Sequence, residues 1–255
     1  MSVFSNLGTE GLEEAQDFLG GFQTLATDAY VATIKAMYAG KAAASNAQNV
    51  TIIADVNGTE YRETIYITNK QGQNFFHPKD KSGKRDETKR NPLPGFSVVN
   101  DICLFVTGKP LNEQTTEEKV MNVYDPEQRK EMPKSVQVVT ALTGEKIGLA
   151  IIREIVFKQE KNTSNGEYED TTETRTQNSI DKVFHPELMV TASEVKHAPE
   201  GKTPEADFIP KWLEKNKGVD RDKTKGKTAA GEAPKSGKPG GNSPAPTSSL
   251  FGKKD

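Results

Sequence analysis

The dipeptide Asn57-Gly58 lies between two stretches in which apolar and polar residues alternate, NVTIIADV and TEYRETIYIT. Asn-Gly is the strongest two-residue signal for a β-hairpin, because both central positions of a type I′ turn require a positive φ. The earlier stretch YVATIKAMYAG places every second residue from Tyr30 to Tyr38 on one face, which favours core packing for both tyrosines. The sequence therefore predicts three antiparallel strands before residue 69.

The third of these strands has one apolar face. Tyr61, Ile65 and Ile67 share that face, whereas Arg62 and Tyr66 point to the opposite side of the strand. We therefore expect Arg62 and Tyr66 to lie outside the core.

A helix is predicted after these strands. Phe96, Val99, Ile102 and Val106 follow the three-four spacing of a helix, and a Gly and a Pro follow the last of them. We expect the helix over residues 96–107. Residues 109–135 are polar, and no regular structure is predicted for them.

Two further hairpins are expected in the second half of the chain. One joins residues 135–142 to residues 146–161 through Gly144, and the longer stretch is apolar on both faces, which indicates a central strand. The other returns the chain around Asn165-Gly166. Three strands, a helix and two strands are the element order of an OB-fold. The predicted fold is mainly β, a five-stranded antiparallel OB-fold barrel with one helix between strands 3 and 4.

The expected domain organisation has four parts. They are an N-terminal extension (residues 1–24), the OB-fold domain (25–185), a helical extension (186–216) and a disordered tail (217–255). In the extension, Phe208 and Trp212 are spaced to dock a short C-terminal helix. The tail has nine basic and four acidic residues in a chain of net charge −2, and it is too polar to fold. Its only adjacent large apolar residues, Leu250 and Phe251, are predicted to bind a partner protein.

Sequence motifs for catalysis are absent. The chain has no phosphate-binding glycine loop, no nucleophile elbow and no HExxH zinc motif. Cys103, the only cysteine, falls inside the predicted apolar helix, and His77, His185 and His197 have no companion ligand at metal spacing. We expect no enzyme activity, no cofactor, no metal, and no membrane span, because no apolar run is long enough.

The segment NKQGQNFFHPKDKSGKR opens the most basic loop of the chain. Residues 69–91 contain seven basic and three acidic residues, in a body that is otherwise acidic. Such a loop attracts phosphates, and aromatic rings beside it can stack on unpaired bases. The residues predicted to bind nucleic acid are Arg62, Tyr66, Lys70, Phe75, Phe76, Lys79, Lys81, Lys84, Arg85, Lys89 and Arg90.

The roles of Phe75 and Phe76 remain open at this point. Adjacent residues of an extended chain point to opposite sides, so a core can bury only one of the two rings. The sequence is compatible with three arrangements. Both rings stack on bases, a ring caps the barrel, or one ring stacks and the other caps.

Several separated motifs resemble one family. ETIYITNKQGQNFF, LPGFSVVNDICLF, NSIDKVFHPE, WLEKNKGVDRDKTKGK and SLFGKKD are similar to segments of the single-stranded DNA-binding proteins of bacteriophages, particularly N4-like phages. The resemblance implies a protein that coats and protects single-stranded DNA in phage replication, recombination and repair, in the cytoplasm of the infected host. The partners expected for Leu250 and Phe251 at the end of the C-terminal tail are replication or transcription proteins. A strand-annealing or recombination mediator, and a non-enzymatic phage structural or adaptor protein, are the alternatives.

Overall fold

The structure is a computed structural model that describes residues 24–42, 45–125, 128, 130–161 and 168–225. It is mainly β, with two sheets and three short helices in these ranges. The strands are β1 (Asp28–Lys41), β2 (Gln48–Val56), β3 (Thr59–Tyr66), β4 (Phe75–Phe76), β5 (Asn91–Pro92), β6 (Glu117–Asp125), β7 (Lys130–Val138), β8 (Lys146–Lys161), β9 (Tyr168–Phe184) and β10 (Arg221–Asp222). The helices are α1 (Pro94–Thr107), α2 (Ala192–His197) and α3 (Phe208–Asn216), with single 3-10 turns η1 (Leu111–Glu113) and η2 (Thr140–Leu142).

The hairpin and the helix predicted for the first half of the chain are confirmed. Asn57 and Gly58 have φ of 52° and 81°, and they join β2 to β3 in antiparallel register. Helix α1 begins with Pro94 and ends at Gly108, whose φ of 71° supplies the left-handed C-cap. Its buried residues pack in the main core with the inner faces of β1, β2, β3 and β8.

A register shift in β1 changes which residues face the core. The shift lies between Ile34 and Ala36 in the pairing with β2, which is the signature of a β-bulge. Ile34 therefore lies in the main core, whereas Ala36 and Tyr38 lie in a second cluster with Ile53 of β2. The prediction of one continuous face from Tyr30 to Tyr38 is wrong, because the extra residue reverses the alternation.

Hairpin β6–β7 covers that second cluster. Met121, Val123 and Val136 of the hairpin pack against the outer face of β1 and β2. Residues 109–135 had no predicted strands, because most residues of β6 and β7 are polar and the exposed Val120 and Tyr124 blur the alternation. The sheet thus has eight strands rather than the five expected.

The predicted hairpin between residues 135–142 and 146–161 does not form. Strand β7 pairs with β6 and with Tyr38 and Ala39 of β1, and β8 pairs with an earlier part of β1. The connection stays beside β1, because the Gly144 N–H donates to the Ile34 carbonyl at 2.7 Å. Strand β8 is central, as predicted, with β9 antiparallel along its other edge.

The sheet is not closed into a barrel between β3 and β9. Backbone pairing between these two strands is absent from the described structure. The Glu63 carboxylate of β3 lies between them instead, accepting from the Ile180 N–H at 2.9 Å and from the Tyr61 hydroxyl at 2.6 Å. Burial raises the pKa of the Glu63 carboxyl. One side chain thus bridges the gap where an OB-fold barrel would close.

Helix α3 packs on the outer side of β8 and β9. Ile209 and Trp212 are buried against Ile152 and Phe184, and the Trp212 indole donates to Asp181 at 2.7 Å. Phe208, which was predicted to dock, is 43% exposed. The helix therefore docks through Trp212, as predicted, but through Ile209 in place of Phe208.

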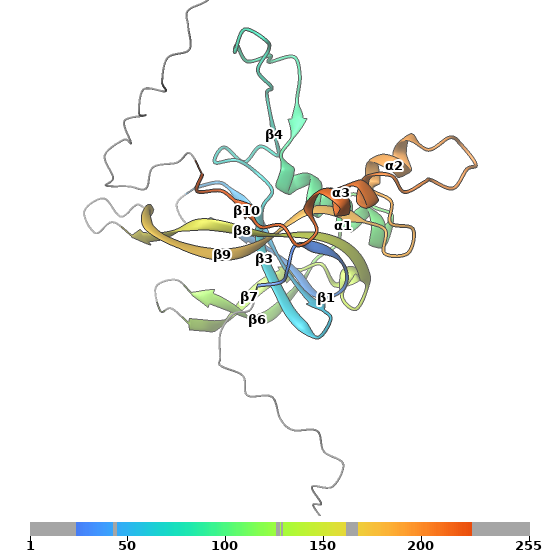
Figure 1. The fold of residues 1–255 in the computed structure, drawn as a ribbon. Coiled ribbons are helices and arrows are strands. Elements are labelled where there is room, and N and C mark those ends of the chain that lie inside the picture. Colours follow the sequence, from blue (N-terminus) through green and yellow to red (C-terminus); the bar gives the residue numbers. More distant parts are fainter. Residues whose placement is uncertain (1–23, 43–44, 126–127, 129, 162–167, 226–255) are drawn as a thin grey trace, which may run out of the picture.

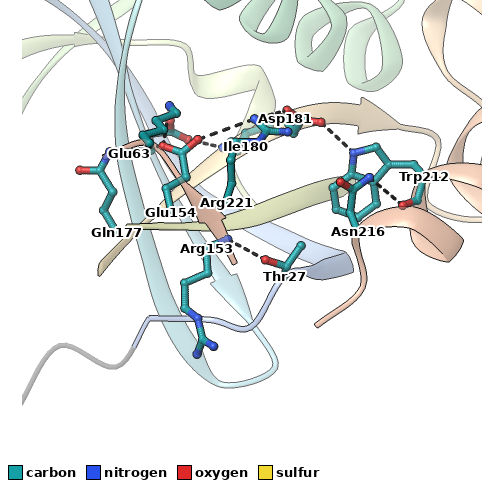
Figure 2. Close-up of polar contacts among 11 residues, drawn as sticks. Thr27, Glu63, Arg153, Glu154, Gln177, Ile180, Asp181, Trp212, Asn216 and Arg221 are labelled. Carbon is teal, nitrogen blue, oxygen red and sulfur yellow. Dashed lines mark hydrogen bonds and ion pairs between the residues drawn. The ribbon is translucent and has the colours of Figure 1, made fainter. Parts of the chain in front are cut away.

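Residues 217–225, assigned to the tail from the sequence, lie on the folded body and are called the C-terminal strap (Figure 1). The strap includes β10, which pairs in parallel with β8. Lys223 Nζ lies 2.7 Å from Glu154 of β8. Arg221 lies 3.0 Å from Asp181 and 3.7 Å from Glu154 (Figure 2). Glu154 is 1% exposed, so the strap supplies the cations that compensate a buried carboxylate.

Candidate nucleic-acid interface

The basic loop forms a projecting arm, residues 69–92, called the basic arm. In Figure 1 it extends away from the sheet, with β4 near its base. Strands β4 and β5 pair Phe75 with Pro92 and Phe76 with Asn91, and a further bridge joins Lys79 to Arg85. The arm is thus a narrow antiparallel ladder in place of the irregular loop that its composition indicates.

Polar side chains hold the two turns of the arm. At its base, Asn69 Oδ1 accepts from the backbone N–H groups of Gln71 and Gln73 at 3.0 and 2.9 Å. At its tip, Asp80 Oδ1 accepts from the N–H groups of Ser82 and Lys84 at 2.8 and 3.0 Å. Each side chain replaces backbone partners that a short turn lacks.

The cations of the arm all face solvent. Every one of its seven basic side chains is exposed: Lys70, Lys79, Lys81, Lys84, Arg85, Lys89 and Arg90. Hydrogen bonds from Ser82 and Thr88 lower the pKa of Asp80 and Asp86, respectively. Lys89 pairs with Asp86 at 3.3 Å, an exposed pair that water screens. The arm therefore keeps a net positive charge at neutral pH.

The two adjacent phenylalanines have different surroundings. The Phe75 ring has the Arg90 guanidinium at 4.7 Å from its centroid and the His77 ring edge-on at 5.5 Å. Phe76 is 43% exposed. Neither ring lies in a hydrophobic core cluster, so the alternative in which one caps the barrel is wrong. Phe75 packs within the arm, and the face of Phe76 is accessible.

The two predicted residues of β3 have different surroundings. Tyr66, at the base of the arm, is 54% exposed. Arg62 forms ion pairs with Glu60 and with Glu131 of β7. The sequence could not indicate the second pair, because it depends on hairpin β6–β7 crossing the outer face. Two carboxylates thus compete with any phosphate for Arg62.

A polar cleft on the other side of β3 is a poorer site for nucleic acid. It has a volume of about 470 Å³ and lies between β3, α1, β9 and the C-terminal strap. Its charged lining residues are Glu63, Asp101, Glu154, Asp181, Lys182, Arg221 and Lys223. Arg221 and Lys223 already pair with Glu154 and Asp181, so the cleft offers a phosphate fewer free cations than the basic arm does.

Other chemistry-bearing residues form no cluster in the described ranges. Cys103 is buried in α1, and burial raises the pKa of its thiol to about 12, which disfavours the reactive thiolate. Among the described residues no three His, Cys, Asp or Glu side chains come together to hold a metal ion. Residues 1–23 and the predicted partner-binding residues Leu250 and Phe251 lie outside the described residues.

The chain matches no protein-family model, and no curated protein or solved structure shows significant similarity to it. Within the described ranges, the helices are too short or too polar to span a membrane.

Proposed function

We propose that the protein binds single-stranded DNA without strong base preference. The basic arm contacts phosphates, and Phe76 and Tyr66 stack on bases. The Phe75 ring packs against the Arg90 guanidinium and stabilises the conformation of the arm. Arg62, which is already paired with Glu60 and Glu131, contributes little.

The observation that carries this proposal is the position of exposed aromatic rings among exposed cations. Phe76 lies on the arm itself, and Tyr66 lies where β3 leads into it. Base stacking tolerates any sequence, because every base has a π face, while cations bind the backbone common to all sequences. Single strands offer both groups at once, whereas a duplex hides the base faces.

We also propose that the sheet is a variant of the OB-fold. Strands β1, β2, β3, β8 and β9, with α1 between β3 and the later strands, follow the element order of an OB-fold. In this interpretation hairpin β6–β7 is an insertion, and Glu63 substitutes for the pairing that closes the barrel.

The motif resemblance supports a proposal for the cellular role of this DNA binding. A phage protein of this kind coats and protects single-stranded DNA during replication, recombination and repair in the cytoplasm of the infected host, and it is not an enzyme. Its basic tail, ending near Leu250 and Phe251, would recruit replication or transcription proteins. A strand-annealing mediator would share the same DNA contacts.

A protein-binding adaptor is the second candidate. Val120 and Tyr124 of the edge strand β6 are 72% and 55% exposed, a pattern that suits strand addition by a partner. Such an adaptor would not need the cations of the arm.

Binding to matched single- and double-stranded oligonucleotides over a salt series distinguishes these functions. We expect the single strand to bind more tightly, with log K falling by about 0.7 per phosphate neutralised as log salt rises. Fluorescence anisotropy measures both quantities. Equal affinity for the duplex, or no binding at low salt, would falsify the proposed function.

A further inference from the structure

Three residues form a row across the outer face of the sheet beside the arm. Gly40 of β1 is paired with Asn49 of β2, and Asn49 is paired with Tyr66 of β3. Directly paired residues of neighbouring strands point to the same side of the sheet. Strands lie about 4.8 Å apart, so the row spans about 10 Å, enough for a base and its sugar. We call Gly40, Asn49 and Tyr66 the outer row.

The outer row lies at the edge of the area that hairpin β6–β7 covers. The hairpin buries the next positions along the strands, Ala36, Tyr38 and Ile53. Tyr66 is more than half exposed, and Gly40 and Asn49 are partly exposed. A nucleotide can therefore reach this row.

The Asn49 amide lies over Gly40. A Cβ atom added to Gly40 would come within 2.4 Å of Asn49 Oδ1, far inside van der Waals contact. The φ of Gly40 is not positive, so the backbone does not require glycine there. The Asn49 side chain forms no hydrogen bond to another described residue. Glycine thus leaves the space for a side-chain amide that has a free donor and a free acceptor.

We propose that Asn49 binds the Watson–Crick edge of an unpaired base that stacks on Tyr66. This inference rests on the proposed function. An asparagine amide has a carbonyl acceptor beside an NH₂ donor. The Watson–Crick edge of each base has a donor beside an acceptor, in one order or the other, and a turn of the amide about its last bond matches either order. Unpaired bases can be bound through that edge, whereas in a duplex the opposite strand occupies it.

The consequence is that binding depends on whether a base is unpaired, and not on which base it is. Asn49 favours single strands because only they present the free edge. It is indifferent to sequence because its amide accommodates both donor–acceptor orders. Gly40 is a positioning residue that keeps the amide in place.

The test compares Asn49→Ala with Gln48→Ala. Gln48 is an exposed amide next to Asn49, and it points to the opposite side of β2. We expect Asn49→Ala to weaken binding of oligo-dA, oligo-dC and oligo-dT by about tenfold each, as the loss of a bidentate base contact does, and to leave duplex affinity unchanged. Gln48→Ala should change neither affinity, and Gly40→Ala should reproduce the loss because it displaces the amide.

Melting temperatures of all the variants report whether they remain folded. If wild-type protein binds single strands and a folded Asn49→Ala variant binds them equally well, Asn49 has no such role, although the proposed function survives. A loss confined to one oligonucleotide, or an equal loss on duplex, also overturns the inference. Failure of the wild-type protein to bind any single strand contradicts the proposed function itself.

Discussion

Truncation after Asn216 is expected to lower the free energy of unfolding by about 3 to 5 kcal/mol relative to truncation after Lys225. The shorter chain loses Lys223 and Arg221, the cations that pair with the buried Glu154. It also loses Asp220, which accepts from Arg153 at 2.7 Å. An uncompensated buried charge costs more than the pair contributes, so loss of the cations should dominate. Urea denaturation followed by circular dichroism measures the difference.

Point variants separate this charge effect from the loss of chain. Lys223→Met should destabilise the full-length protein, whereas Lys225→Met, at an exposed position two residues away, should not. Glu154→Gln should recover part of the stability of the chain that ends at Asn216. Equal stability of the two truncated chains would show that the C-terminal strap is dispensable and that the tail begins at residue 217 after all.

Trp212→Ala is expected to lower the free energy of unfolding by about 3 to 5 kcal/mol, the usual cost of removing a buried large aromatic side chain. Trp212 is 5% exposed and packs with Ile209 in the cluster on the outer side of β8. The substitution also removes the hydrogen bond to Asp181. Chemical denaturation with a circular dichroism readout tests this value.

Phe208→Ala is the matched control on the same helix. The Phe208 ring is 43% exposed, and its centroid lies 5.7 Å from Lys182 Nζ. Its loss should cost less than about 1 kcal/mol. If the two variants are equally stable, α3 does not dock through Trp212.

The sequence was sufficient for the local elements. Asn57-Gly58 predicts its hairpin because the turn conformation depends on those two residues alone. The three-four spacing from Phe96 predicts α1, and the doubly apolar stretch predicts β8 as a central strand. Each of these signals is contained within a short window of the chain.

The missed features depend on contacts between distant segments. The bulge near Ile34 is unmarked by glycine or proline, and it alone decides that Tyr38 faces hairpin β6–β7. That hairpin is half polar, so its alternation is weak. The C-terminal strap is hydrophilic because its partner is a buried carboxylate, Glu154, rather than an apolar core.

The candidate site likewise has some features that the sequence predicts and others that it does not. The charge of the basic arm follows from composition, and the limit on burying adjacent side chains indicates that at least one of Phe75 and Phe76 is accessible, without saying which. The neutralisation of Arg62 by Glu131 and the alignment of Gly40, Asn49 and Tyr66 require the strand register. Register is set by the tertiary structure, so these residues could not be grouped from the sequence.

The affinity of a Tyr66→Ala/Phe76→Ala double variant for single-stranded DNA tests the proposed stacking most directly. Both rings are exposed, so the variant should melt at nearly the wild-type temperature. Stacking contributes about 1 to 3 kcal/mol per base, so affinity for a single-stranded oligonucleotide should fall at least about tenfold, while weak duplex binding through the cations stays the same. A folded double variant that binds the single strand as tightly as the wild-type protein would contradict the assignment of these rings as the base-binding surface.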